Sequence, residues 1–198
     1  MSLPDDMLLL ATRRFDRDEE GGAVHAEDLA QALGLRADPN AAYRGVTYAG
    51  IARFVSTLMD ADDHVEFARR LVFMVLSGNG DAHAKNWGIF YPDGIHARLS
   101  PAYDLVFTRS YVRGSELALK MGRAADRSWG SVTRASLLSA LAGTGVGAAV
   151  LQDTLGTMVE TATARLGDAL ARVEAPPDSS TLQALRTHLE VMRVALGT

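Results

Sequence analysis

Apolar residues recur at helical spacing over most of this chain of 198 residues, and a short central segment interrupts the pattern. The amphipathic stretches are Thr47 to Met59, Asp62 to Ser77, Val132 to Leu141, Gly145 to Val173 and Thr181 to Leu196. Each has one apolar face, and such faces must be buried against one another. We therefore predict a mainly α fold.

The N-terminal part is less regular. Met7 to Phe15 is predicted as a short apolar strand, and Gly21-Gly22 marks a turn after it. Ala26 to Leu35 has helical spacing and is predicted as a further helix. Near the other end, the two prolines in Ala175 to Asp178 separate the last two helices.

The interruption in the middle is typical of a β-hairpin. Trp87 to Tyr91 and Ile95 to Ser100 are short strand-like runs, and Pro92-Asp93-Gly94 lies between them. Proline fixes φ, the aspartate carboxylate accepts hydrogen bonds from nearby backbone N–H groups, and glycine adopts positive φ without strain. A small central hairpin in a helical domain is the predicted architecture.

Charge and cysteine content exclude several classes of partner. The chain has 20 basic and 24 acidic residues, a net charge of −4, and therefore no broad cationic surface for direct binding of nucleic acid or an anionic membrane. It has no cysteine, which excludes disulfides and thiolate metal sites and fits a reducing compartment. Since no apolar run approaches membrane-spanning length, we expect a cytoplasmic protein.

Three polar residues frame the predicted hairpin. Asp81 lies in a glycine-rich loop, Asn86 lies where the first strand begins, and Asp104 lies just beyond the second strand. Because a tight hairpin returns its second strand beside its first, Asn86 and Asp104 are expected to lie close together in space. Two oxygen donors then face the same point.

This arrangement suits phosphoryl transfer from ATP. Mg²⁺ prefers oxygen ligands, so Asn86 and Asp104 are predicted to bind it while nucleotide phosphates supply further oxygens. Asp81 is predicted to be the general base that accepts the proton of an attacking hydroxyl. An Asp-x-x-x-x-Asn loop, a hairpin and a metal-binding aspartate follow one another in this order in protein kinases.

The loop spacing by itself is a weak signal. Asp-x-x-x-x-Asn joins two common residues, and Gly78, Asn79, Gly80 and Asp81 would also form an ordinary turn after a helix. When the hairpin and Asp104 are considered as well, the loop is more typical of a catalytic site than of an ordinary turn.

Four segments resemble the HipA family of serine/threonine kinases. They are Arg14-Phe15-Asp16-Arg17, Val24 to Gly34, the loop from Gly78 to Asn86, and Ser100-Pro101-Ala102-Tyr103-Asp104-Leu105. They follow the order of the family from about Leu8 to Leu119, and the later helices are compatible with it. The resemblance implies that residues 1–198 form a single HipA-like C-terminal kinase lobe.

The resemblance also implies further site residues. It places His83 and Lys85 against the nucleotide phosphates, Tyr103 near the nucleotide, and Arg14 and Phe15 at the adenine hinge. The family commonly has an acidic residue where Arg13 stands, so a contact with adenine there would run through the backbone. ATP and Mg²⁺ are the implied cofactors.

Members of the family are toxins of toxin–antitoxin pairs, and a DNA-binding antitoxin and a protein substrate are the implied partners. A kinase of this plan also needs a glycine-rich loop and a strand lysine, and Met1 to Thr12 contain neither. We therefore expect an N-terminal lobe, from the same or a separate chain. The alternatives are a catalytically incomplete pseudokinase, an antitoxin-binding helical module, or a small-molecule phosphotransferase.

Overall fold

The computed structural model describes residues 12–35, 41–109, 116–123, 126–172 and 180–197. The α-helices are α1 (Leu29–Ala32), α2 (Tyr48–Leu58), α3 (Ala61–Leu76), α4 (Arg134–Leu141), α5 (Ala148–Arg172) and α6 (Ser180–Leu196). The strands are β1 (Ala26–Asp28), β2 (Gly88–Phe90) and β3 (Arg98–Leu99), and the 3₁₀ helices are η1 (Ala41–Tyr43), η2 (Ala84–Asn86), η3 (Trp129–Ser131) and η4 (Ala142–Thr144). The predicted mainly α fold with a small β element is confirmed.

Local capping explains where the two central helices begin. The Thr47 side chain accepts a hydrogen bond from the backbone N–H of Gly50 at the start of α2. The Asp60 side chain accepts from the N–H groups of Asp62 and Asp63 at the start of α3. Both helices lie within one or two residues of their predicted bounds.

The helix predicted from Ala26 to Leu35 is wrong in its first part. Residues Ala26–Asp28 form β1, which pairs antiparallel with β2, so that the sheet order is β1-β2-β3. Asp28 then caps α1 through a capping box with Gln31, and Gly34 has φ +62° just past the end of the helix. The apolar spacing was helical, but pairing with β2 satisfies the backbone of these residues instead.

The hairpin prediction is confirmed, with shorter strands than expected. Gly94 has φ +77° and donates its N–H to the carbonyl of Tyr91 at 3.0 Å. The carboxylate of Asp93 accepts from the backbone N–H groups of Ile95 at 3.0 Å and His96 at 2.8 Å.

The predicted strand from Met7 lies outside the described residues as far as residue 11, and Thr12 to Phe15 are irregular. The proline segment at 175–178 also lies outside the described residues.

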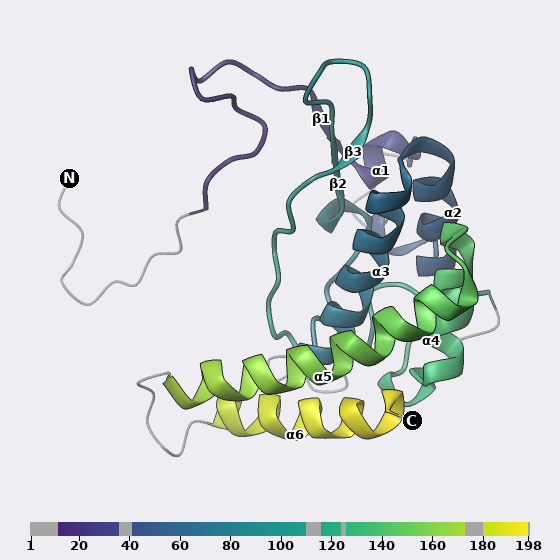
Figure 1. The fold of residues 1–198 in the computed structure, drawn as a ribbon, viewed down its shortest axis with the longest axis vertical. Helices are drawn as coiled ribbons and strands as arrows, with labels where there is room; N and C mark the ends of the chain where they lie inside the picture. Colours follow the sequence, from purple (N-terminus) through teal and green to yellow (C-terminus); the bar gives the residue numbers. More distant parts are fainter. Residues whose placement is uncertain (1–11, 36–40, 110–115, 124–125, 173–179, 198) are drawn as a thin grey trace, which may run out of the picture.

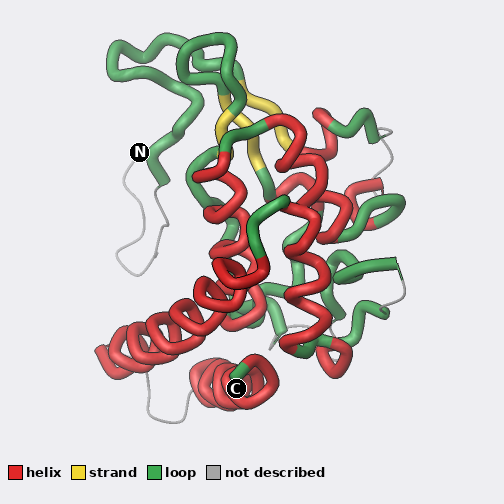
Figure 2. The backbone as a smooth tube through the Cα atoms, turned by 45° about the vertical axis from the view of Figure 1, so that its right-hand side comes forward, coloured by secondary structure: helices red, strands yellow, loops and turns green. Residues whose placement is uncertain are grey.

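The sheet and the C-terminal helices lie at opposite ends of the molecule (Figure 1), and α3 runs between them. Helices α5 and α6 lie side by side in both views (Figures 1 and 2), and α3 packs against both. One hydrophobic core links these elements and extends from Leu29 in α1 to Leu196 in α6. Helix α3 thus belongs to the same core as both ends of the molecule.

His188 of α6 fixes the C-terminal end of α3. Its side chain is buried, and Nε2 donates to the carbonyl of Val75 at 2.8 Å. Burial lowers the pKa of His188 to about 4, so the ring is neutral near pH 7 and Nδ1 is free to accept from the Arg109 guanidinium. Arg109 in turn lies over the Trp129 ring, 5.2 Å from its centroid.

In the described part of the chain, no helix is long and apolar enough to cross a membrane.

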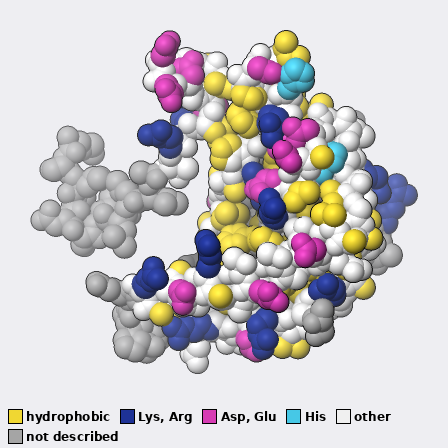
Figure 3. Space-filling view, in the orientation of Figure 1, with side chains coloured by type: hydrophobic (Ala, Val, Ile, Leu, Met, Phe, Trp, Pro, Cys, Tyr) yellow, Lys and Arg dark blue, Asp and Glu magenta, His cyan; other side chains and the backbone are white. Residues whose placement is uncertain are grey.

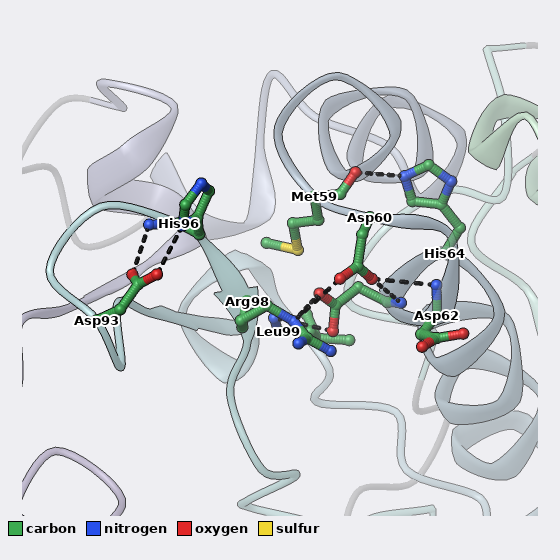
Figure 4. Close-up of polar contacts among 9 residues, drawn as sticks. Met59, Asp60, Asp62, His64, Asp93, His96, Arg98 and Leu99 are labelled. Atoms are coloured by element: carbon green, nitrogen blue, oxygen red, sulfur yellow. Dashed lines mark hydrogen bonds and ion pairs between the residues drawn. The ribbon is translucent and has the colours of Figure 1, made fainter.

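Asp63 ties the hairpin to α3. Its carboxylate is buried and accepts from Arg98 Nε at 2.7 Å and from the backbone N–H of Leu99 at 3.2 Å. Figure 4 shows Arg98 pointing from β3 toward the first turn of α3. This contact sets the position of β3, and therefore of the segment that leads to Asp104.

We expect Asp63→Ala to lower the free energy of unfolding by about 1–3 kcal/mol, because the N–H of Leu99 loses its acceptor inside the protein. Urea unfolding followed by circular dichroism measures the change. Asp62→Ala is the matched control, since Asp62 is an exposed acid in the same helical turn. An equal loss in both variants would mean that only the charge at the helix N-terminus matters.

Candidate active site

The loop that follows α3 begins at Gly78 and ends in η2. Gly78 has φ +68°, and a Cβ there would lie 2.6 Å from the Phe107 ring and 2.9 Å from the His188 ring. Glycine is therefore required at this position both for backbone conformation and for space. Its packing fixes the direction in which the chain leaves the helix.

Asn86 lies beside Asp104, as the hairpin pattern predicted. Its Nδ2 donates to Asp104 Oδ2 at 2.9 Å and to the backbone carbonyl of Asp81 at 2.8 Å. Both amide hydrogens are thus used, which leaves Oδ1 of Asn86 as the acceptor that can bind a ligand. The predicted base and the two predicted metal ligands lie in one connected group.

Asp104 adopts a backbone conformation that few non-glycine residues take. Its φ is +54°, in the left-handed region, which costs about 1–2 kcal/mol for most side chains. The buried Asn79 stabilises this conformation, because its Nδ2 donates to the carbonyl of Asp104 at 3.0 Å. Oδ1 of Asn79 accepts from the N–H of Asp81 at 3.1 Å, so one side chain fixes both segments. Such strain is typical of functional positions.

Asp81 has a hydrogen-bond partner far away in the sequence. The hydroxyl of Tyr43 in η1 donates to Asp81 Oδ1 at 2.8 Å. Burial, together with this bond to the carboxylate, raises the pKa of Tyr43 to about 12, so its hydroxyl keeps its proton at neutral pH. The Tyr43 ring also meets the His83 ring edge-on, with centroids 4.6 Å apart.

Phe15 and Tyr103 form an aromatic pair beside this group. Their rings are stacked with centroids 5.9 Å apart, and Phe15 also contacts the edge of Phe90 at 6.1 Å. The Tyr103 hydroxyl donates to the carbonyl of Lys85 at 2.7 Å, which joins the pair to η2. Burial raises the pKa of Tyr103 to about 12. Two of the residues expected to contact the nucleotide thus lie against each other.

Two other predicted site residues are not held at the site by their side chains. Arg14 pairs with Asp16, its Nε lying 2.7 Å from Oδ1, and its side chain is 66% exposed. Lys85 is exposed, and within the described ranges its ammonium makes no ion pair. Their predicted contacts with a nucleotide stay predictions.

The surface next to Asp104 is apolar. Leu105 and Val106 follow it directly, and each is 44% exposed. Figure 3 shows hydrophobic side chains gathered on a hollowed face of the molecule, between the sheet end and α5. A face of this kind is suited to covering by another protein surface.

The donor set fits a magnesium ion held partly by a ligand. Among the described residues, no three His, Asp or Glu side chains converge to hold a metal by themselves. Asn86 Oδ1 and a second oxygen of Asp104 are hard donors, and Mg²⁺ sites of enzymes that act on nucleotides commonly combine one or two such groups with phosphate oxygens and water.

The sequence did not reveal Tyr43 and Asn79 as site residues. Tyr43 precedes the site by 38 positions in an irregular stretch, so neither periodicity nor motif spacing points to it. Asn79 lies in the loop itself, where it was interpreted only as a turn former. Its buried position is the distinguishing feature, and that is visible only in three dimensions.

Two curated relatives are similar to about half of the chain. The protein named "Putative kinase Y4dM" of Sinorhizobium fredii is 48% identical over 109 residues, which are 55% of this chain and 26% of that protein. The protein named "Putative kinase" of Haemophilus influenzae is 36% identical over 109 residues, 50% of this chain and 30% of that protein. The matched regions thus span about a quarter to a third of these relatives.

A solved structure shares the fold. It is the HipA toxin of Shewanella oneidensis, determined with HipB and its operator DNA. The TM-score is 0.71 at 20% sequence identity, over 91% of this chain and 46% of that one. The sequence pattern of the HipA-like C-terminal domain matches residues 2–169. This chain therefore belongs to the family of HipA-like C-terminal domains.

Proposed function

We propose that this chain is the catalytic lobe of an ATP- and magnesium-dependent serine/threonine protein kinase of the HipA toxin type. The observation that carries the proposal is the pair of hydrogen bonds from Asn86, which joins the Asp81 backbone to the Asp104 carboxylate. Asn86 thus links the loop that carries the candidate base to the second candidate metal ligand, and phosphoryl transfer needs such groups close together. The names of the two curated relatives support the same reaction class.

Each residue of the site has a separate task in this proposal. Asp81 accepts the proton of the attacking hydroxyl, and Asn86 and Asp104 hold the metal ion. Bound magnesium would neutralise charge on the transferring phosphoryl group. His83 donates to a phosphate oxygen.

A second set of groups binds the nucleotide. Lys85 reaches the phosphates from η2, while Phe15 and Tyr103 form the floor under the adenine. Arg14 lies at the hinge, where its backbone is the part available to the base, because its guanidinium is paired with Asp16.

The family and the surface support the proposed partners. An N-terminal lobe, from the same or a separate chain, packs on the apolar face beside Asp104. Since the Shewanella oneidensis toxin was determined with HipB and operator DNA, a DNA-binding antitoxin is the second proposed partner. A cytoplasmic location and a protein substrate complete the proposal.

Calorimetry with ATP tests the metal assignment. We expect the chain by itself to bind ATP weakly and only with magnesium, because carboxylates repel a polyanion unless a cation bridges them. Asp104→Asn should abolish the magnesium-dependent heat. Asp93→Asn, which removes the same charge at the hairpin turn, should leave that heat in place.

Tight binding without magnesium would contradict the proposed site, as would unchanged binding by the Asp104→Asn variant. Phosphate transfer that appears when an N-terminal lobe is added would support it directly.

A further inference from the structure

Three tyrosines from separate parts of the chain hold the loop that carries Asp81. Tyr103 donates its hydroxyl to the carbonyl of Lys85 at 2.7 Å, and Tyr48 donates to the carbonyl of Ala82 at 3.2 Å. Both of these bonds end on the backbone. The third tyrosine, Tyr43, donates to a carboxylate oxygen of Asp81 itself.

We infer that Tyr43 is a positioning residue for Asp81. Its hydroxyl occupies one oxygen of the Asp81 carboxylate, so that the other oxygen faces the incoming hydroxyl. The inference rests on the proposed function, since it needs Asp81 to be the base. A carboxyl group turns easily about its Cβ–Cγ bond, and a hydrogen bond to one oxygen selects one orientation. The 2.8 Å contact with Oδ1 leaves Oδ2 as the oxygen that accepts the proton.

The phenol is suited to this task. With its pKa raised by burial and by the neighbouring carboxylate, Tyr43 stays a donor throughout the pH range in which an enzyme works. A phenol that stays protonated cannot compete with Asp81 for the substrate proton. It therefore fixes the base without taking over its role.

The position of Tyr43 is itself fixed on two sides. Its ring meets the His83 ring at an interplanar angle of 80°, with centroids 4.6 Å apart. Backbone hydrogen bonds hold His83 in the same loop, because its N–H donates to the carbonyl of Asp81 at 2.8 Å. Tyr43 thus contacts both the candidate base and the residue proposed to meet the phosphate, and it keeps their spacing constant.

The contact can be tested in this chain without any activity. With tyrosine labelled at the ring carbon that bears the hydroxyl, Asp81→Ala, which removes both carboxylate oxygens, should move the ¹³C resonance of Tyr43 and leave that of Tyr103 in place. Assignment comes from the Tyr43→Phe, Tyr48→Phe and Tyr103→Phe variants, each of which removes one signal. An unmoved Tyr43 resonance would show that the bond to Asp81 is absent in solution and would overturn the inference.

The effect on catalysis is tested in the complete enzyme. Tyr43→Phe should lower kcat about tenfold and leave the KM for ATP within about twofold, because it misorients the base without touching the nucleotide. In an Asp81→Asn background, the same Tyr43→Phe change should have no further effect on the rate.

The possible outcomes separate the two proposals. If Asp81→Asn is nearly as active as the wild type, the proposed base is wrong. If Asp81→Asn is inactive and Tyr43→Phe is fully active, the base stands and the positioning role of Tyr43 is overturned. An equal loss from Tyr43→Phe in both backgrounds would also overturn it, since Tyr43 would then act independently of Asp81.

Discussion

Replacing Asp81 by asparagine in a complete enzyme that contains this chain is expected to lower the rate of phosphotransfer by about a hundredfold or more. An amide cannot accept the proton of the attacking hydroxyl, whereas a carboxylate can. The loss should fall on kcat, because the nucleotide is proposed to contact other residues. Transfer of radiolabelled phosphate from ATP to protein, measured at saturating ATP, gives kcat.

The loop should survive this substitution. The bonds that fix it involve the backbone of Asp81, whose carbonyl accepts from Asn86 and whose N–H donates to the side chain of Asn79. Asparagine retains both backbone groups and keeps one side-chain oxygen for Tyr43. Thermal unfolding and ATP affinity should therefore change little.

Asp153→Asn serves as the matched control, since Asp153 is exposed on α5 and the change in charge is the same. We expect its activity to equal that of the wild type. Near-normal activity in Asp81→Asn would exclude Asp81 as the base and would leave the proposed kinase mechanism without a proton acceptor.

Gly78→Ala is expected to lower the free energy of unfolding by about 2–4 kcal/mol. Part of the loss comes from the backbone, because a side chain at φ +68° costs about 1–2 kcal/mol. The rest comes from overpacking, because the added Cβ would lie 2.6 Å from Phe107 and 2.9 Å from His188. The His188 ring is buried and hydrogen-bonded to the carbonyl of Val75, so it cannot move aside freely.

Gly94→Ala separates the two contributions. Gly94 has φ +77°, close to that of Gly78, but a Cβ there would meet no atom within 4 Å. It should show the backbone cost alone, about 1–2 kcal/mol. Urea unfolding measures both losses. If the dependence of the free energy on urea concentration is the same in all variants, the shift in the unfolding midpoint gives the change in stability. Equal losses at the two glycines would mean that Phe107 and His188 yield easily and do not fix the start of the loop.

Much of the fold was predictable because its signals are local. The caps at Thr47 and Asp60 and the apolar spacing after them specify α2 and α3 within a few neighbouring residues. The Pro92-Asp93-Gly94 tripeptide likewise specifies its turn through φ preferences and one aspartate carboxylate. The convergence of Asn86 and Asp104 then follows from the hairpin, which brings the two ends of the segment together.

The tertiary structure decided what depends on partners distant in the sequence. Ala26–Asp28 form a strand because they pair with β2 through backbone hydrogen bonds, although the side-chain pattern predicted a helix. Tyr43 reached Asp81 across 38 positions, and Asn79 reached Asp104 across 25. By itself, the sequence determined helices α2 to α6 and the hairpin turn and singled out Asp81 and Asp104 as candidate acids, since these depend on short-range patterns. Only packing decided which neighbours hold those acids in place, because such contacts form between segments whose spacing no local pattern encodes.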